Sequence, residues 1–140
     1  MTKGIMMKLA NKKYNSYNVF FAKVDNILKA KREEIPEEDR VYLQDIKGVR
    51  VGKTPSVFYY YYNNREYYFT AQNALFSVDI NGYITWYYGD WLDGFFRNGT
   101  WVDGTWHNGT WCNGDWLDGD WISGTWYKGT IDGSPSNTNP

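Results

Sequence analysis

The stretch "GTWHNGTWCNGDW", residues 104–116, contains three tryptophans spaced five residues apart, each with a glycine two places before it. The same spacing continues in both directions along the chain. Large apolar residues recur at Trp86, Trp91, Phe96, Trp101, Trp106, Trp111, Trp116, Trp121, Trp126 and Ile131. Glycines recur in phase at Gly89, Gly94, Gly99, Gly104, Gly109, Gly114, Gly119, Gly124 and Gly129. A repeat this regular does not arise by chance, and it sets the architecture of residues 86–133.

A period of five residues fits neither an α-helix nor a flat strand, whose side-chain periods are 3.6 and 2.0. It fits a short extended segment followed by a corner. Asp-Gly and Asn-Gly pairs supply the corner, because glycine adopts positive φ without steric cost and Asp or Asn bonds to nearby backbone. Repeated corners of one hand produce a coil, and stacked coils produce a β-solenoid.

The unit Gly-Thr-Trp at 104–106 and 109–111, and Gly-Asp-Trp at 114–116, resembles the repeat of the pentapeptide-repeat family. The resemblance implies a right-handed, four-sided β-helix with 20 residues per coil. Glycine replaces the family's usual alanine, and tryptophan replaces its Leu or Phe. Twenty residues per coil are favoured over the alternative of 15, in which Arg97, Cys112 and Tyr127 would be neighbours. Tandem Trp-Gly pentads are also similar to those of uncharacterised bacteriophage proteins.

The tryptophans are expected to form the core. In an extended pentad, Trp faces one way and its two neighbours face the other. If Trp pointed outward, Arg97, His107 and several aspartates would be buried, at several kcal/mol for each unpaired charge. Burying an indole instead stabilises the fold by roughly 2–3 kcal/mol. The alternative, a row of exposed tryptophans, would be typical of a carbohydrate-binding surface.

The rest of the chain divides into three further parts, which makes the expected fold mainly β. Residues 1–48 are a basic lead-in followed by one or two helices, over about 17–34 and over Glu37–Ile46, the second closing at Gly48. Residues 49–85 are antiparallel hairpins capping the solenoid, with turns at "NNR" (63–65) and, as a type I′ turn, at Asn81-Gly82. The polar, Pro-containing residues 134–140 are expected to be a disordered tail.

Neither an enzyme nor a metal or cofactor site is indicated. Cys112 is the only cysteine and His107 the only histidine, so disulfides within the chain and Cys-His metal clusters are excluded. These two residues occupy equivalent repeat positions but lack the orienting group that a nucleophile pair needs. The basic N-terminus has no signal-peptide pattern, and no apolar run is long enough to span a membrane. Synthesis in a cytoplasm is therefore expected, with association with a virion as one destination.

With Trp inside, the coils should expose apolar residues that a lone soluble domain usually hides. They form a possible surface for a protein partner or for self-association: Leu92, Val102, Leu117, Ile122 and Tyr127. The leading hypothesis is a non-enzymatic structural or protein-interaction module, either a phage virion component or a small host-directed phage factor. The Lys-, Asn- and Tyr-rich composition, typical of AT-rich genomes, favours the phage origin.

The charge distribution supplies one alternative hypothesis. The formal net charge is -1, which disfavours nucleic acid as a partner of the whole chain. Residues 1–85, however, carry 13 Lys and Arg against 9 Asp and Glu, whereas residues 86–140 carry 2 against 7. An acidic solenoid could mimic DNA and inhibit a DNA-binding enzyme, and carbohydrate binding through exposed tryptophans is the other alternative. Turn formation is the simpler explanation of the aspartates.

Overall fold

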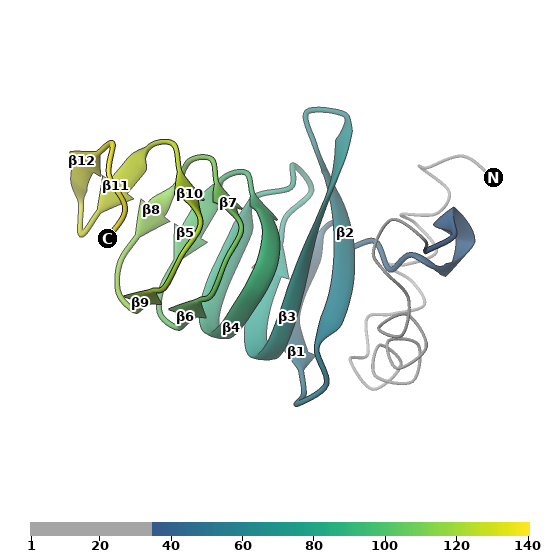
Figure 1. The fold of residues 1–140 in the computed structure, drawn as a ribbon. Helices are drawn as coiled ribbons and strands as arrows, with labels where there is room; N and C mark the ends of the chain where they lie inside the picture. The colour runs from purple at the N-terminus through teal and green to yellow at the C-terminus, as the bar shows by residue number, and fades with distance from the viewer. Residues whose placement is uncertain (1–34) are drawn as a thin grey trace.

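The computed structural model describes residues 35–140, which form an elongated stack of strands (Figure 1). Antiparallel strands lie at one end, and a β-solenoid of about three turns extends from them to the C-terminus. A single 3-10 helix, η2 (Glu37–Asp39), precedes the strands. The strands are β1 (Ile46–Val51), β2 (Ser56–Tyr62), β3 (Arg65–Val78), β4 (Ile84–Phe96), β5 (Gly99–Trp101), β6 (Thr105–Trp106), β7 (Thr110–Trp111), β8 (Asp115–Trp116), β9 (Asp120–Trp121), β10 (Thr125–Trp126), β11 (Gly129–Ile131) and β12 (Ser134–Ser136).

The expected helix over Glu37–Ile46 is wrong, because only Glu37–Asp39 turns and the chain then becomes extended. Backbone hydrogen bonds to β2 replace helical ones: Leu43 N donates to Tyr59 O at 2.7 Å, and Tyr59 N donates to Val41 O at 2.8 Å. This pairing buries Val41, Tyr42 and Leu43 together, which a helix would have spread over different faces. The helix expected over 17–34 lies outside the described residues.

The hairpin predicted at "NNR" is confirmed. β2 and β3 pair antiparallel up to Tyr62 and Arg65, so Asn63 and Asn64 form a two-residue turn. Both asparagines have positive φ, 52° and 63°, which a type I′ turn requires. Asparagine tolerates this region better than most residues because its short amide side chain can bond locally.

The hairpin between β3 and β4 is also present, but its two-residue type I′ turn is not. Val78 pairs with Ile84, so residues 79–83 form a longer loop. The Asp79 carboxylate shapes it, because Oδ1 accepts hydrogen bonds from Asn81 N at 2.8 Å and Tyr83 N at 3.0 Å. Gly82, at φ 84°, is the loop's one residue with positive φ. The Asp79 side chain therefore overrides the local Asn-Gly preference.

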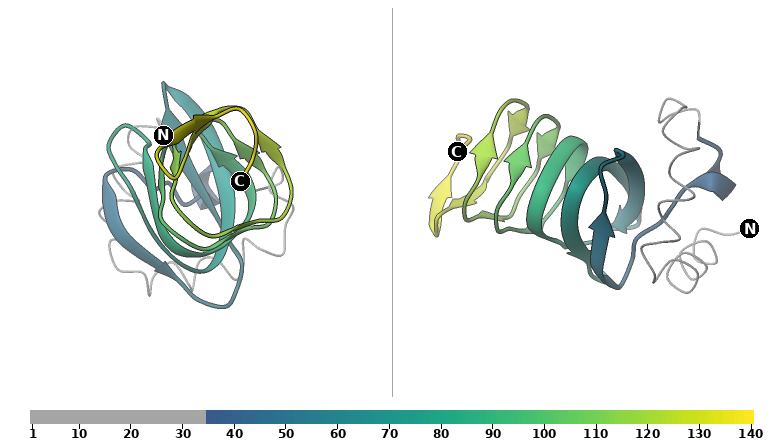
Figure 2. Two further views of the ribbon diagram at one scale, coloured as in Figure 1. Left: turned by 90° about the vertical axis from the view of Figure 1, so that its left-hand side faces the viewer. Right: turned by 90° about the horizontal axis from the view of Figure 1, so that it is seen from below.

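The solenoid has three strands per turn and 15 residues per turn, so the favoured value of 20 is wrong (Figure 2). Trp101 pairs with Trp86, Trp106 with Trp91 and Trp111 with Phe96, and the next turn repeats this register. Successive tryptophans around a turn meet edge to face, with centroids 5.8 Å apart for Trp101–Trp106 and 5.9 Å for Trp106–Trp111. Three such side chains fill the cross-section. A fourth side would enlarge the interior beyond what the rings fill.

Each side of the solenoid is a column of parallel strands, and we name the columns by their strands. Column A is the start of β4 with β5, β8 and β11; column B is the middle of β4 with β6 and β9; column C is the end of β4 with β7 and β10. Within each column the indoles stack nearly parallel, 4.9–5.1 Å apart. The corner after column A is corner A, and corners B and C follow in order.

The tryptophans point inward, as expected. Seven of the eight indoles are buried, and Trp121 is half-buried. Phe96 is fully buried, and Ile131 is partly buried over Trp116, its register partner. A sugar-binding row of exposed tryptophans is therefore excluded for this chain, since every Trp lies within residues 86–126.

Glycine is required at the corners for a reason that the sequence did not reveal. Gly104 has φ 124°, and a Cβ there would overlap the carbonyl oxygen of Gly89 in the preceding turn. The same Cβ would lie 3.1 Å from Nε1 of Trp86. The absence of a side chain thus lets the coils approach and leaves room for the indole edge. This explains glycine in place of the alanine expected from the pentapeptide-repeat family.

Aspartates and asparagines before the glycines serve the corners as well. Oδ1 of Asp103 accepts a hydrogen bond from Gly104 N at 2.8 Å, and Asp118 does the same for Gly119 N. Asp93 and Asn98 repeat the contact with Gly94 and Gly99. Much of the array's negative charge is therefore turn chemistry.

The antiparallel strands cap the first turn by extending its aromatic columns. β3 follows the path of β4 and bends at Asn73, where φ is 48°. Phe76 stacks on Trp86 at 5.2 Å, and Phe69 stacks on Trp91 at 4.7 Å. Because β3 supplies both rings and the paired backbone, the solenoid has no open strand edge at this end.

The disordered tail expected over 134–140 is wrong for Ser134–Ser136. These residues form β12, which pairs antiparallel with β11, and Ser136 O accepts a hydrogen bond from Trp126 Nε1 at 3.1 Å. Asp132 and Gly133, both at positive φ, reverse the chain and allow the pairing. A polar segment can pack here because its contribution is backbone hydrogen bonding.

Substituting Gly109→Ala should destabilise the fold by roughly 3 kcal/mol or more, because the new Cβ would sit 2.9 Å from Gly94 N and nearer still to its carbonyl oxygen. Gly133→Ala is the matched control, since Gly133 also has positive φ but open space around it. The control should lose only about 1 kcal/mol. Denaturant unfolding measures both free energies, and equal losses would contradict the steric argument.

Trp121 should dominate quenching of the intrinsic fluorescence by acrylamide. The other seven indoles are buried, so native emission should be blue-shifted, with a small quencher-accessible fraction. Trp121→Phe should remove most of that fraction, whereas Trp106→Phe should leave it unchanged. A red-shifted, fully quenched native spectrum would contradict the buried core.

Candidate interaction surface

The residues predicted to form one partner surface lie on three different corners. Because a turn has 15 residues, Val102 and Leu117 share corner A, while Leu92 and Ile122 share corner B. Tyr127 lies on corner C. Leu92 and Val102 are half-buried, whereas Leu117, Ile122 and Tyr127 are 46%, 60% and 64% exposed. The structure thus divides the predicted set and leaves its last three members on separate corners.

These three residues form what we call the apolar rim: Leu117, Ile122 and Tyr127, one at each corner of the last turn. Their equivalents one turn earlier, Val102 and Cys112 among them, are half-buried because a further turn stacks over them. The rim has no such cover within residues 35–140. Three large exposed apolar side chains around one end of a domain are typical of a protein contact.

The charges of the array are sorted by side. All seven aspartates of residues 86–140 lie on columns A and B and their corners, whereas Arg97 and Lys128 both lie at corner C. Column C itself carries Phe95, Thr110 and Thr125 on its outer face. Periodicity of 15 produces this sorting, which a period of 20 would have scrambled. Two sides of the solenoid are acidic and the third is neutral to basic.

His107 and Cys112, the one pair with nucleophile chemistry, are not brought together. His107 lies at corner B, where its Nε2 is 3.5 Å from Asp90 Oδ1, and Asp90 also accepts a hydrogen bond from Gln72. Cys112 lies at corner C beside Arg97. No cluster of three His, Cys, Asp or Glu side chains suited to a metal occurs within the described residues.

Arg97 joins the hairpin to the solenoid. Its guanidinium carbon lies 5.2 Å from the Tyr62 ring centroid and 4.9 Å from that of Tyr67, so the cation stacks against both rings. Its Nη1 is 3.6 Å from Cys112 Sγ, and its backbone N donates to the Tyr60 hydroxyl at 3.3 Å. Burial raises the pKa of the Cys112 thiol, although the nearby Arg97 charge opposes that shift.

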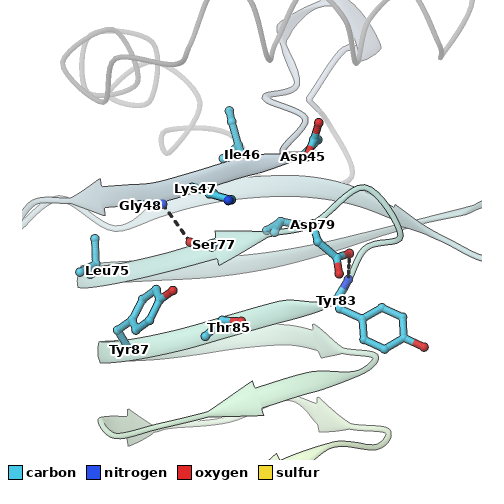
Figure 3. A pocket seen from close by; sticks show the side chains of 11 residues that line it. Asp45, Ile46, Lys47, Gly48, Leu75, Ser77, Asp79, Tyr83, Thr85 and Tyr87 are labelled. Atoms are coloured by element: carbon cyan, nitrogen blue, oxygen red, sulfur yellow. Dashed lines mark hydrogen bonds between the residues drawn. The ribbon is translucent and has the colours of Figure 1, made fainter.

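A groove of about 520 Å³ crosses the outer face of β1, β3 and β4 (Figure 3). Ser77 and Thr85 line its middle, and Ser77 Oγ accepts a hydrogen bond from Gly48 N at 2.9 Å. The Tyr87 ring leans toward Leu75 and Ser77, while the Tyr83 ring points away and packs on Tyr62 at 5.7 Å. Sequence reasoning missed this groove, because it depends on which outward residues of three strands become neighbours.

No helix among residues 35–140 has the length and apolarity needed to cross a membrane.

Cys112 should react slowly with iodoacetamide in the native protein. Because burial raises its pKa, the thiolate forms at higher pH than in an exposed cysteine. The pH at which alkylation reaches half its maximal rate should therefore be higher for the folded chain than for the same chain in urea. A native midpoint equal to or below the unfolded one would contradict the buried environment.

Comparisons of the chain with protein-family models, curated proteins and solved structures find no match. The β-solenoid is shown by the chain's own geometry, and membership of the pentapeptide-repeat family is not.

Proposed function

We propose that this chain is a non-enzymatic structural or protein-interaction module, used either as a phage virion component or as a small host-directed phage factor. The apolar rim carries the proposal, because Leu117, Ile122 and Tyr127 expose large side chains at all three corners of the last turn. Such exposure is unfavourable in water unless a partner covers it.

The build of the solenoid supports a scaffold role. Its interior consists of stacked aromatic rings, and its backbone is bonded between turns, as in Leu117 N to Trp101 O at 2.9 Å and Ile122 N to Trp106 O at 2.8 Å. Carboxylates such as Asp103 and Asp118 are engaged in holding corners. A body of this kind presents its exterior residues at fixed spacing, which favours recognition by preorganisation.

A second candidate is a DNA mimic, favoured by the sorting of seven aspartates onto two sides. Its limit is length. About three turns at roughly 4.8 Å each span only about 15 Å, which is short against a duplex contacted over a full helical turn.

The rim should be needed for capture of a protein partner. We would immobilise the full chain and expose it to an extract of cells in which it is made, comparing wild type with Leu117→Ser/Ile122→Ser/Tyr127→Ser. The matched control is Ile80→Ser/Tyr83→Ser/Tyr88→Ser, which removes three exposed apolar residues away from the rim. Wild type and control should retain the same protein in near-stoichiometric amount, and the rim variant should retain about tenfold less.

Two outcomes would overturn the interaction-module proposal. Equal loss of the retained protein by rim variant and control would remove the rim's role. Retention of a DNA-binding enzyme that duplex DNA displaces would favour the DNA mimic instead. Circular dichroism and tryptophan emission of each variant establish that the solenoid is intact.

A further inference from the structure

Column B ends without a cap within the described residues. β9 pairs with β6 and with no other strand, whereas column A is closed by β11 and β12. In column C the tail reaches the last ring, since Trp126 Nε1 donates to Ser136 O. In Figure 1, β12 lies beyond β11, and no strand lies beyond β9. Trp121 therefore stacks on Trp106 at 5.0 Å on one side only, and it is the one half-buried indole.

The backbone of β9 offers the hydrogen bonds that each turn offers to the next. Gly104 O accepts from Asp120 N at 2.9 Å, and Trp106 O accepts from Ile122 N at 2.8 Å. The corresponding acceptors one turn later are Gly119 O and Trp121 O, for which the described residues supply no donor. An unpaired strand edge of this kind binds extended peptide segments by adding a strand.

The surroundings of this edge are acidic. The last turn and its corners carry four aspartates, Asp115, Asp118, Asp120 and Asp132, against one lysine, Lys128. Asp118 and Asp120 flank Gly119 in sequence and are both exposed. A second copy docked edge to edge would place like charges against each other. A segment with positive charges would be attracted instead.

We propose that β9 is a docking edge for an extended, lysine-rich segment of a partner protein, which adds as the next strand of column B. Its central apolar side chain covers Trp121, continuing the stack, and its flanking lysines lie beside Asp118 and Asp120. Ile122 of the apolar rim borders the same edge. This inference rests on the proposed function and names the chemistry of the partner.

The test uses the full chain and three peptides. The probe is acetyl-Lys-Thr-Ile-Thr-Lys-amide. One control replaces both lysines by aspartate, and the other replaces the central isoleucine by proline, which removes a backbone donor and restricts the strand. Acrylamide quenching of Trp121 and amide exchange at residues 119–122 report binding, with peptide up to about 5 mM because short segments bind weakly. The lysine peptide should lower the quenchable fraction and protect the Trp121 amide, and neither control should.

Two variants separate the charge contribution from the fold. Asp118→Asn/Asp120→Asn should weaken binding of the lysine peptide about three- to tenfold, whereas Asp93→Asn/Asp103→Asn, which removes two acids from earlier turns, should change it less than twofold. No response of Trp121 to the lysine peptide, or equal binding of the aspartate peptide, would overturn the proposal. Sedimentation showing a dimer that protects Trp121 and excludes the peptide would identify a second copy as the occupant and would overturn it too.

The two proposals fail separately. Partner capture that depends on the rim but is unaffected by excess lysine peptide would overturn the docking edge and leave the interaction module standing. Peptide binding at β9 without any captured protein would uphold the edge and contradict the function proposed for the rim.

Discussion

Stacking of indole rings along the solenoid axis is the interaction on which the other features depend. Within each column the rings lie about 5 Å apart and nearly parallel, and this separation matches the spacing of hydrogen-bonded strands. Around the axis the same rings meet edge to face. Both arrangements are favourable for aromatic pairs, so one side chain satisfies the core in two directions. The number of sides follows, because three indoles fill a turn.

The glycines make that packing possible. A Cβ at Gly104 would meet the turn below and the edge of Trp86 together, so the largest side chain depends on the smallest residue one turn away. The pentad is thus a single physical unit whose parts act across 15 to 18 residues. Aspartate or asparagine ahead of the glycine holds the corner through its side-chain oxygen, as Asp103 and Asp118 do. Charge, corner and core are therefore coupled in every repeat.

The two ends of the stack are finished differently, and this asymmetry underlies the proposed function. At the first turn, β3 supplies Phe69 and Phe76 beneath the indoles together with a full set of backbone partners. At the last turn, β12 closes column A, and Trp121 keeps one face of its ring uncovered. The exposed apolar rim lies around this second end. Chemistry suited to a partner is thus concentrated where the repeat stops.

The sequence by itself determined the repeat, the inward tryptophans, the corners and the hairpins, because each rests on short-range periodicity and on the cost of burying charge. Residues per turn, the grouping of Leu117, Ile122 and Tyr127 around one end, and the open edge at β9 were decided only in the tertiary structure. They depend on how many rings fill a cross-section, which no five-residue window contains. The order of Ser134–Ser136 and the extended path after Glu37–Asp39 escaped prediction for a related reason. Both segments take their conformation from a strand distant in sequence or folded back on them, and their own residue preferences do not encode it.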